Sequence, residues 1–229
     1  MCICQAKIAP MHICLDPGHG GEDKGATARK HQEKTVTLAI ARYLDQELKL
    51  RGYQTSMTRS TDTHKELWER TAFANAIKAD LFISIHANIA AQSHAAGIET
   101  YVLRHNSLEI NQKLGAKPLV VAKEPEDIHH ILQDVRLDGT AHASHLCACA
   151  LQHHLSHSAQ KNRGVKTGLF HVLLDTHMPS VLVETGFLSN TQDAHYLLAA
   201  KSQKEIAIAM ANAIDDYSQG IPHTCSLQE

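Results

Sequence analysis

This sequence has few aromatic side chains and no excess of basic charge. Phe, Trp and Tyr together make up 4% of the 229 residues, and 22 Lys and Arg stand against 24 Asp and Glu. Stacking on nucleic-acid bases needs aromatic rings, and binding to phosphates or anionic lipids needs surplus positive charge. The composition therefore argues against a nucleic-acid partner.

Long apolar stretches are absent as well. No run approaches the roughly 20 apolar residues that cross a bilayer, so we expect no stable insertion into a membrane. Residues 1–11 lack the apolar core of a secretory signal, and no signal peptide is visible in the chain as given.

The cysteines lack the Cys-x-x-Cys spacing of a structural zinc site. The six residues are Cys2, Cys4, Cys14, Cys147, Cys149 and Cys225. Disulfides form in oxidising compartments, but their pairing is not readable from sequence, and we predict free thiols.

Histidine, by contrast, is abundant, with 18 residues. Tracts such as His129-His130 and residues 153–157 lie outside any stronger ligand pattern, and the histidines at 153–157 have no carboxylate three or four positions away. We therefore interpret these histidines as solvated helix faces and not as metal ligands. Only histidines within a stronger pattern are candidates for function.

Apolar periodicity indicates strands that alternate with helices. Apolar runs predict strands at residues 12–15, 53–58, 81–85, 97–103 and 181–183, and a further element at 165–174. Helical spacing predicts helices at 34–51, with Gly52 as cap, 67–78, 141–160 and from about 192 or 202 to 217. This alternation predicts a parallel sheet in a single α/β domain at residues 12–218. Short tails remain at 1–11 and 219–229, the second of them disordered.

Side chains suited to metal binding stand where predicted strands end. His19, His86 and Glu184 each follow directly after an apolar run or the short loop that it enters. The carboxyl ends of parallel strands share one edge, where open α/β sheets place their sites. Glu33, which opens the first helix, lies on the same side.

Two histidines and one carboxylate match a catalytic zinc site, which commonly keeps three protein ligands and one position for water. Zinc polarises a substrate carbonyl and lowers the pKa of its water toward about 7, but the proton still needs an acceptor. A carboxylate that does not bind the metal supplies this acceptor. The pattern favours a zinc-dependent hydrolase.

Six stretches of the chain carry a family resemblance. In order they are LDPGHGG at 15–21, EK at 33–34, TR at 58–59 with Asp62, SIHAN at 84–88, RGVK at 163–166 and PSVLVETGFLSN at 179–190. Together they resemble the zinc-dependent N-acetylmuramoyl-L-alanine amidases of bacterial cell walls. The resemblance implies that His19, Glu33 and His86 bind one Zn²⁺ per chain and that Glu184 is the catalytic base. It also implies a central, mostly parallel sheet of about six strands with helices on both faces.

Some of these residues also have a purely structural interpretation. Glu33 is a favourable charge at a helix N-terminus, and Glu184 is able to cap a backbone turn. Their joint occurrence in this order makes coincidence improbable. His31 is the rival of Glu33 as a ligand, and the family's Glu-Lys pair favours Glu33.

Three further polar residues stand near the candidate site. Asp16, three residues before His19, is a candidate to orient that imidazole, although a turn-forming Asp is equally plausible. Glu99 and Asn88 resemble the family pattern, and their contacts with metal or substrate stay open.

The resemblance implies hydrolysis of the amide bond between N-acetylmuramic acid and L-alanine in peptidoglycan or muropeptides. We expect a monomer, in the periplasm or cell envelope if the protein is exported. A zinc peptidase acting on stem peptides is the alternative enzyme. A catalytically silent wall-binding module is a further alternative, which the retained ligands and Glu184 argue against.

Some members of the family carry an inserted helix that occludes the zinc until a partner withdraws it. Residues 103–131 offer limited room for such a helix. We therefore predict an open, unregulated site.

Overall fold

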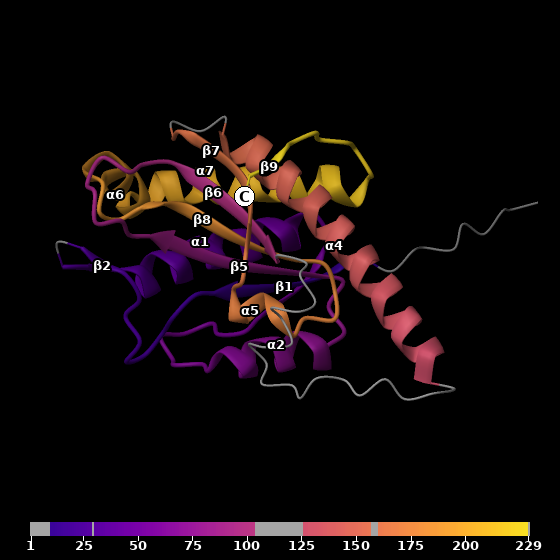
Figure 1. The fold of residues 1–229 in the computed structure, drawn as a ribbon. Coiled ribbons are helices and arrows are strands. Elements are labelled where there is room, and N and C mark those ends of the chain that lie inside the picture. The colour runs from indigo at the N-terminus through magenta and orange to yellow at the C-terminus, as the bar shows by residue number, and fades with distance from the viewer. Residues whose placement is uncertain (1–9, 29, 104–125, 157–159, 229) are drawn as a thin grey trace, which may run out of the picture.

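A seven-stranded sheet forms the centre of the computed structural model, which describes residues 10–28, 30–103, 126–156 and 160–228, with only the backbone at 126–138 (Figure 1). The strands lie in the order β4-β1-β5-β8-β6-β7-β9. Their bounds are β1 His12–Pro17, β4 Gln54–Met57, β5 Leu81–Asn88, β6 Ile98–Leu103, β7 Asn162–Gly168, β8 Ser180–Phe187 and β9 Leu227–Gln228. A separate ribbon pairs β2 (Thr27–Ala28) with β3 (His31–Gln32).

Most neighbouring strands of the large sheet run parallel. β4, β1, β5 and β8 share one direction, β6 runs antiparallel to β8, and β7 and β9 run parallel to β6. The prediction of a central, mostly parallel sheet is confirmed. Within the described residues, the large sheet has one strand more than the six expected, because the two-residue strand β9 adds to its edge.

Helices cover both faces of this sheet, as expected. α1 (Glu33–Leu50), α4 (Glu126–Ser156) and α7 (Ala200–Ser218) pack on one face, and α2 (Leu67–Ala76) and α5 (His171–Leu174) pack on the other (Figure 1). α6 (Thr191–Leu198) contacts β8. The larger hydrophobic core lies under α1, α4 and α7. None of the described helices is long and apolar enough to cross a membrane.

The sequence of α1 explains why this helix packs on the sheet. Its buried apolar residues recur at helical spacing and form one face: Val36, Leu38, Ile40, Ala41, Leu44 and Leu48. Gly52 follows the helix with φ 90°, a conformation that glycine adopts without a Cβ clash. The helix predicted at residues 34–51 and its glycine cap are confirmed.

Three predicted elements differ from those in the structure. α4 begins at Glu126, well before the expected start at residue 141. Residues 165–174 contain the end of β7 and the short helix α5. The last predicted helix is two helices, because Ala199 has an extended backbone (φ −80°, ψ 122°) between α6 and α7.

The segment after α7 corrects two expectations. The expectation of a disordered tail is wrong for its described part, because β9 pairs with β7 and Cys225 forms a disulfide with Cys149 of α4. The prediction of free thiols is therefore wrong for this pair. Nothing in the local spacing reveals that two cysteines separated by 76 positions meet. Cys14 and Cys147 are free and buried.

Removal of this disulfide is predicted to destabilise the fold. A crosslink between residues 76 positions apart restricts the unfolded chain and typically contributes about 2–4 kcal/mol. Cys225 is only partly buried, so Cys225→Ser removes the bond with little loss of packing. We expect the free energy of unfolding to fall by about 2–4 kcal/mol in urea titrations without reductant. Dithiothreitol should reproduce the loss in the wild-type chain and leave the variant unchanged. Equal stability of the two chains without reductant would contradict this prediction.

Candidate functional site

Strand ends converge at one edge of the sheet. β1, β5 and β8 are adjacent and parallel, so the segments that follow them leave from the same edge. His19 lies two residues beyond β1, His86 stands near the end of β5, and Glu184 is the register partner of His86 on β8. α1 begins with Glu33 at this edge. The structure thus brings together the four residues singled out in the sequence.

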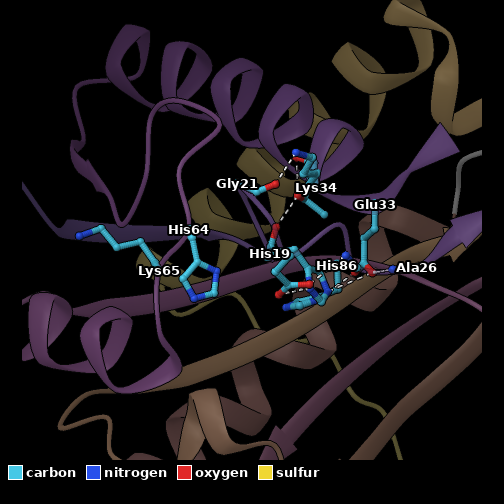
Figure 2. A network of polar contacts seen from close by, with 12 residues as sticks. His19, Gly21, Ala26, Glu33, Lys34, His64, Lys65 and His86 are labelled. Atoms are coloured by element: carbon cyan, nitrogen blue, oxygen red, sulfur yellow. Dashed lines mark hydrogen bonds and ion pairs between the residues drawn. The ribbon is translucent and has the colours of Figure 1, made fainter.

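His19, Glu33 and His86 form a compact group, here called the histidine–glutamate group (Figure 2). Nε2 of His19 lies 3.0 Å from Oε2 of Glu33, and Nδ1 of His86 lies 2.8 Å from Oε1. One ligand atom of each residue lies within 4.8 Å of the other two. The rival ligand His31 is exposed in β3 and does not belong to this group.

Two backbone amides fix the carboxylate of Glu33. Oε1 accepts a hydrogen bond from the N–H of Ala87 at 3.0 Å, and Oε2 accepts one from Ala26 at 2.7 Å. Burial favours a higher pKa for Glu33, but hydrogen bonds from His19 and His86 outweigh it and hold the pKa well below its usual range. The side chain is therefore an anion at neutral pH, the form that binds a metal.

His19 has a backbone conformation that is uncommon for a residue with a side chain. Its φ of 61° lies in the left-handed region, within the Gly-rich loop after β1. Nδ1 of the ring lies 2.8 Å from Oδ2 of Asp23, which leaves Nε2 beside Glu33. The suggestion that Asp16 orients this imidazole is therefore wrong. Asp23 orients it, and no sequence pattern singled out this residue.

Asp16 is instead the centre of a buried polar cluster. Its side chain is fully buried and accepts hydrogen bonds from the hydroxyls of Thr58 at 2.5 Å and Ser84 at 2.8 Å. Nη1 of Arg70 on α2 donates to the same carboxylate at 2.8 Å. Every partner is a strong donor, so this buried charge is compensated.

Two buried arginines hold the backbone that leads from β1 to His19. Arg70 donates to the carbonyl oxygens of Pro17 and His19, both at 2.9 Å. Arg59 donates to the carbonyls of Pro17 at 2.9 Å and Gly18 at 2.8 Å. Burial, together with the charge of Arg70, lowers the pKa of Arg59 to about 10, so the guanidinium stays charged. Arg59 belongs to a family stretch, whereas nothing in the helical pattern marked Arg70.

Lys34 holds the part of this loop at Gly21 (Figure 2). Its Nζ donates to the carbonyl oxygen of Gly21 at 2.6 Å and to Oδ2 of Asp62 at 2.7 Å. Oδ1 of Asp62 accepts the N–H of Gly21 at 2.8 Å. The family residues Lys34 and Asp62 thus position the loop that carries His19.

Glycines leave the space that the histidine–glutamate group occupies. A Cβ on Gly18 would lie 2.4 Å from the ring of His86. A Cβ on Gly25 would lie 2.5 Å from both Oε2 of Glu33 and Cδ2 of His19. A methyl group at either position would therefore displace a candidate ligand.

Glu184 differs from Glu33 in its hydrogen bonding. Its buried Oε2 has no hydrogen-bond partner in the described part of the chain. Burial raises the pKa of Glu184 to about 7. The charge of His86 opposes this rise, and the charges of Glu33 and Glu99 add to it. A carboxylate with an unpaired oxygen and a pKa near neutrality is suited to take up and release a proton.

Glu99, whose role the sequence leaves open, binds two cationic side chains close to Glu184. Nζ of Lys166 lies 2.7 Å from Oε1, and Nε of Arg163 contacts the same oxygen. Asn88 donates weakly to Oε2, at 3.4 Å. Burial favours a higher pKa for Glu99, but these cations lower it, so Glu99 is ionised and belongs to an ion-pair cluster.

Some expectations concern residues that the structure does not describe. Residues 104–125, the larger part of the segment considered for an occluding helix, lie outside the described residues, so the open site stays a prediction. Cys2, Cys4 and His157 lie outside them too, as do the side chains of His129 and His130.

Comparison with known proteins identifies the family of this chain. The model of the N-acetylmuramoyl-L-alanine amidase family (Amidase_3) matches residues 13–216. The chain belongs to this amidase family. AmiA of Escherichia coli, named an N-acetylmuramoyl-L-alanine amidase, is 33% identical to this amidase over 221 residues, covering 90% of the chain and 75% of AmiA.

Two solved structures of N-acetylmuramoyl-L-alanine amidases are similar to this amidase. The catalytic domain of CwlV from Bacillus (Paenibacillus) polymyxa has a TM-score of 0.67 and 31% identity, covering 91% of this chain and 98% of that one. An amidase of Nostoc punctiforme has a TM-score of 0.73 and 28% identity, covering 91% and 97%. The resemblance inferred from six short stretches is thereby confirmed.

Gly25→Ala is predicted to weaken zinc binding at the histidine–glutamate group. The new methyl group meets Glu33 and His19, and the residue has a φ of +62°. Gly52→Ala is a matched control, because Gly52 has a φ of +90° and no heavy atom within 4 Å of a built Cβ. Both variants should lose about 1–2 kcal/mol of stability from backbone strain. Only Gly25→Ala should lower zinc affinity in calorimetric titration, and equal affinities for the two variants would contradict the steric argument.

Proposed function

We propose that this amidase hydrolyses the bond between N-acetylmuramic acid and L-alanine in peptidoglycan, with zinc held by His19, Glu33 and His86 and with Glu184 as the catalytic base. Membership of the amidase family supports the reaction. The observation that carries the proposal is the histidine–glutamate group next to the buried, unpaired carboxylate of Glu184.

The donor set of the histidine–glutamate group fits zinc. Two imidazole nitrogens and one carboxylate oxygen are typical ligands of catalytic zinc, whereas Mg²⁺ and Ca²⁺ prefer oxygen ligands alone. Outer contacts hold the ligands in place, with Asp23 on His19 and the amides of Ala26 and Ala87 on Glu33. A bound zinc ion supplies Lewis acidity, which polarises a carbonyl and acidifies water.

Glu184 handles the proton in this proposal. As a carboxylate it accepts a proton from the water that attacks the amide carbonyl, and the resulting carboxylic acid donates this proton to the departing nitrogen of L-alanine. A pKa of about 7 suits both steps near neutral pH. The absence of a described hydrogen bond on Oε2 leaves this oxygen free for the transfer.

The cell envelope is the proposed location, because peptidoglycan lies there. The disulfide between Cys149 and Cys225 supports it, since disulfides persist in oxidising compartments and are rare in the cytosol. The monomeric state stays a prediction.

Glu184→Gln is predicted to separate metal binding from turnover. The amide keeps the shape of the side chain but accepts no proton, so kcat should fall by about a hundredfold to ten-thousandfold. Zinc content, measured by elemental analysis, should stay at the wild-type level. The control is Glu205→Gln, which changes an exposed carboxylate on α7 and should keep full activity. Near-normal turnover by Glu184→Gln would refute its role as base.

Metal removal and product analysis together test the reaction. Treatment with a chelator should abolish the release of peptides from purified peptidoglycan, and added Zn²⁺ should restore it. Mass spectrometry should find stem peptides with a free amino group on L-alanine. Cleavage within the stem peptide would support a zinc peptidase instead, and zinc binding without any product would support a silent wall-binding module.

A further inference from the structure

A second group of side chains of the types that bind metals lies where α4, α7 and the segment after α7 meet. Nε2 of His154 on α4 lies 2.7 Å from Oδ2 of Asp216 on α7. Nε2 of His223, in the segment after α7, lies 2.8 Å from the same oxygen. One ligand atom of each residue lies within 4.8 Å of the other two. This C-terminal histidine group (His154, Asp216 and His223) shares no residue with the amidase site.

The group corrects the interpretation of the histidine tract at residues 153–157 as a solvated face. No compatible carboxylate stands near His154 at helix spacing, but Asp216 reaches it from another helix, 62 positions further along the chain. The side chain of His154 is only 23% exposed. Packing of α4 against α7 creates this contact, which a pattern within one helix does not reveal.

Two links hold the segment that carries His223 against the helices. The disulfide between Cys149 and Cys225 joins this segment to α4. Cys225 lies only two residues after His223, and Cys149 lies about one helical turn before His153. β9 then pairs with β7. Figure 1 shows the segment in yellow as it returns from α7 toward α4 and β7. His223 is thus positioned in advance, and metal binding requires little further ordering.

The chemistry of the group suits a transition metal. Imidazole nitrogens favour Zn²⁺, Cu²⁺ and Ni²⁺ over Mg²⁺ and Ca²⁺. The three side chains are 14–23% exposed, so an ion from solvent has access. Zinc places such ligands at roughly 2.0–2.2 Å from the metal, which requires the close pairs with Asp216 to separate by only about half an ångström. The ring of His153 lies 4.4 Å from that of His223 and limits its rotation.

We propose that His154, Asp216 and His223 bind a divalent transition-metal ion of the zinc type, which fastens the C-terminal segment to α4 and α7. The ion joins two helices and a segment that the disulfide already holds. With three protein ligands, water completes its coordination. The ion crosslinks segments of the chain, and its occupancy is independent of the amidase reaction.

Calorimetric titration of the chelator-treated, full-length chain with Zn²⁺ tests this proposal. The wild-type chain should bind two ions, and Asp216→Asn should bind one, because a neutral amide does not replace the anionic carboxylate ligand. His195→Ala is the matched control, since it removes an exposed histidine on α6 outside both groups, and it should bind two. Asp216→Asn should keep wild-type amidase activity.

A variant at the amidase site separates this proposal from the proposed function. His19→Ala should lose the ion at the histidine–glutamate group and keep the other, and hydrogen exchange at residues 221–228 should then slow when Zn²⁺ is added. This effect should be absent when Asp216→Asn is added to the same chain. If zinc content does not differ between wild type and Asp216→Asn, the three residues form only an ion-pair cluster and the proposal is overturned.

Two precautions keep the outcome decisive. The titrations contain no reductant, because the freed thiolates of Cys149 and Cys225 with His145 would offer a different set of zinc ligands. If Asp216→Asn does not fold, His223→Gln replaces it, since His223 lies after the last core helix. Retention of both ions by a folded His223→Gln chain also overturns the proposal.

Discussion

The buried ion pair between Asp16 and Arg70 is the contact on which the shape of the amidase site depends. Removal of one partner would leave an uncompensated charge inside the protein, which costs about 3–5 kcal/mol. Other N–H groups of Arg70 donate to the carbonyls of Pro17 and His19. The stability of this pair therefore holds the loop in the conformation where His19 has a positive φ, which alone would be unfavourable.

The pKa values of Glu33 and Glu184 are shifted in opposite directions. Glu33 receives hydrogen bonds on both oxygens and stays ionised, whereas Glu184 is buried with one oxygen unpaired and has a pKa near neutrality. Environments that push the pKa values of neighbouring acids apart commonly divide their roles in catalysis. In the proposed mechanism, Glu33 is a fixed anionic ligand and Glu184 is the group that exchanges protons. The difference in pKa arises from the hydrogen bonds that Glu33 receives from His19 and His86, and from the burial of Glu184.

Much of the fold and of the candidate site could be predicted from sequence, because both follow from local patterns. Apolar runs mark the parallel strands, and in a parallel sheet the residues after such runs meet at one edge, which is why His19 and His86 could be paired. Asp23 and Arg70 could not be predicted, because Asp23 acts through a contact with the ring of His19 and Arg70 through contacts with backbone carbonyls. The disulfide at Cys225 depends on how α4 packs, and the spacing of residues along the sequence does not predict this packing.

The reversed direction of β6 determines which side chains surround Glu184, the proposed catalytic base. In a fully parallel sheet, the first residues of one strand and the last residues of its neighbour lie at opposite edges of the sheet. Since β6 runs against β8, its second residue, Glu99, is in register with Glu184. Because β7 runs parallel to β6, Arg163 near the start of β7 lies at the same edge and contacts Glu99. One inverted strand thus brings ionic side chains from near the beginnings of β6 and β7 to the edge where the ends of β1 and β5 position the histidines.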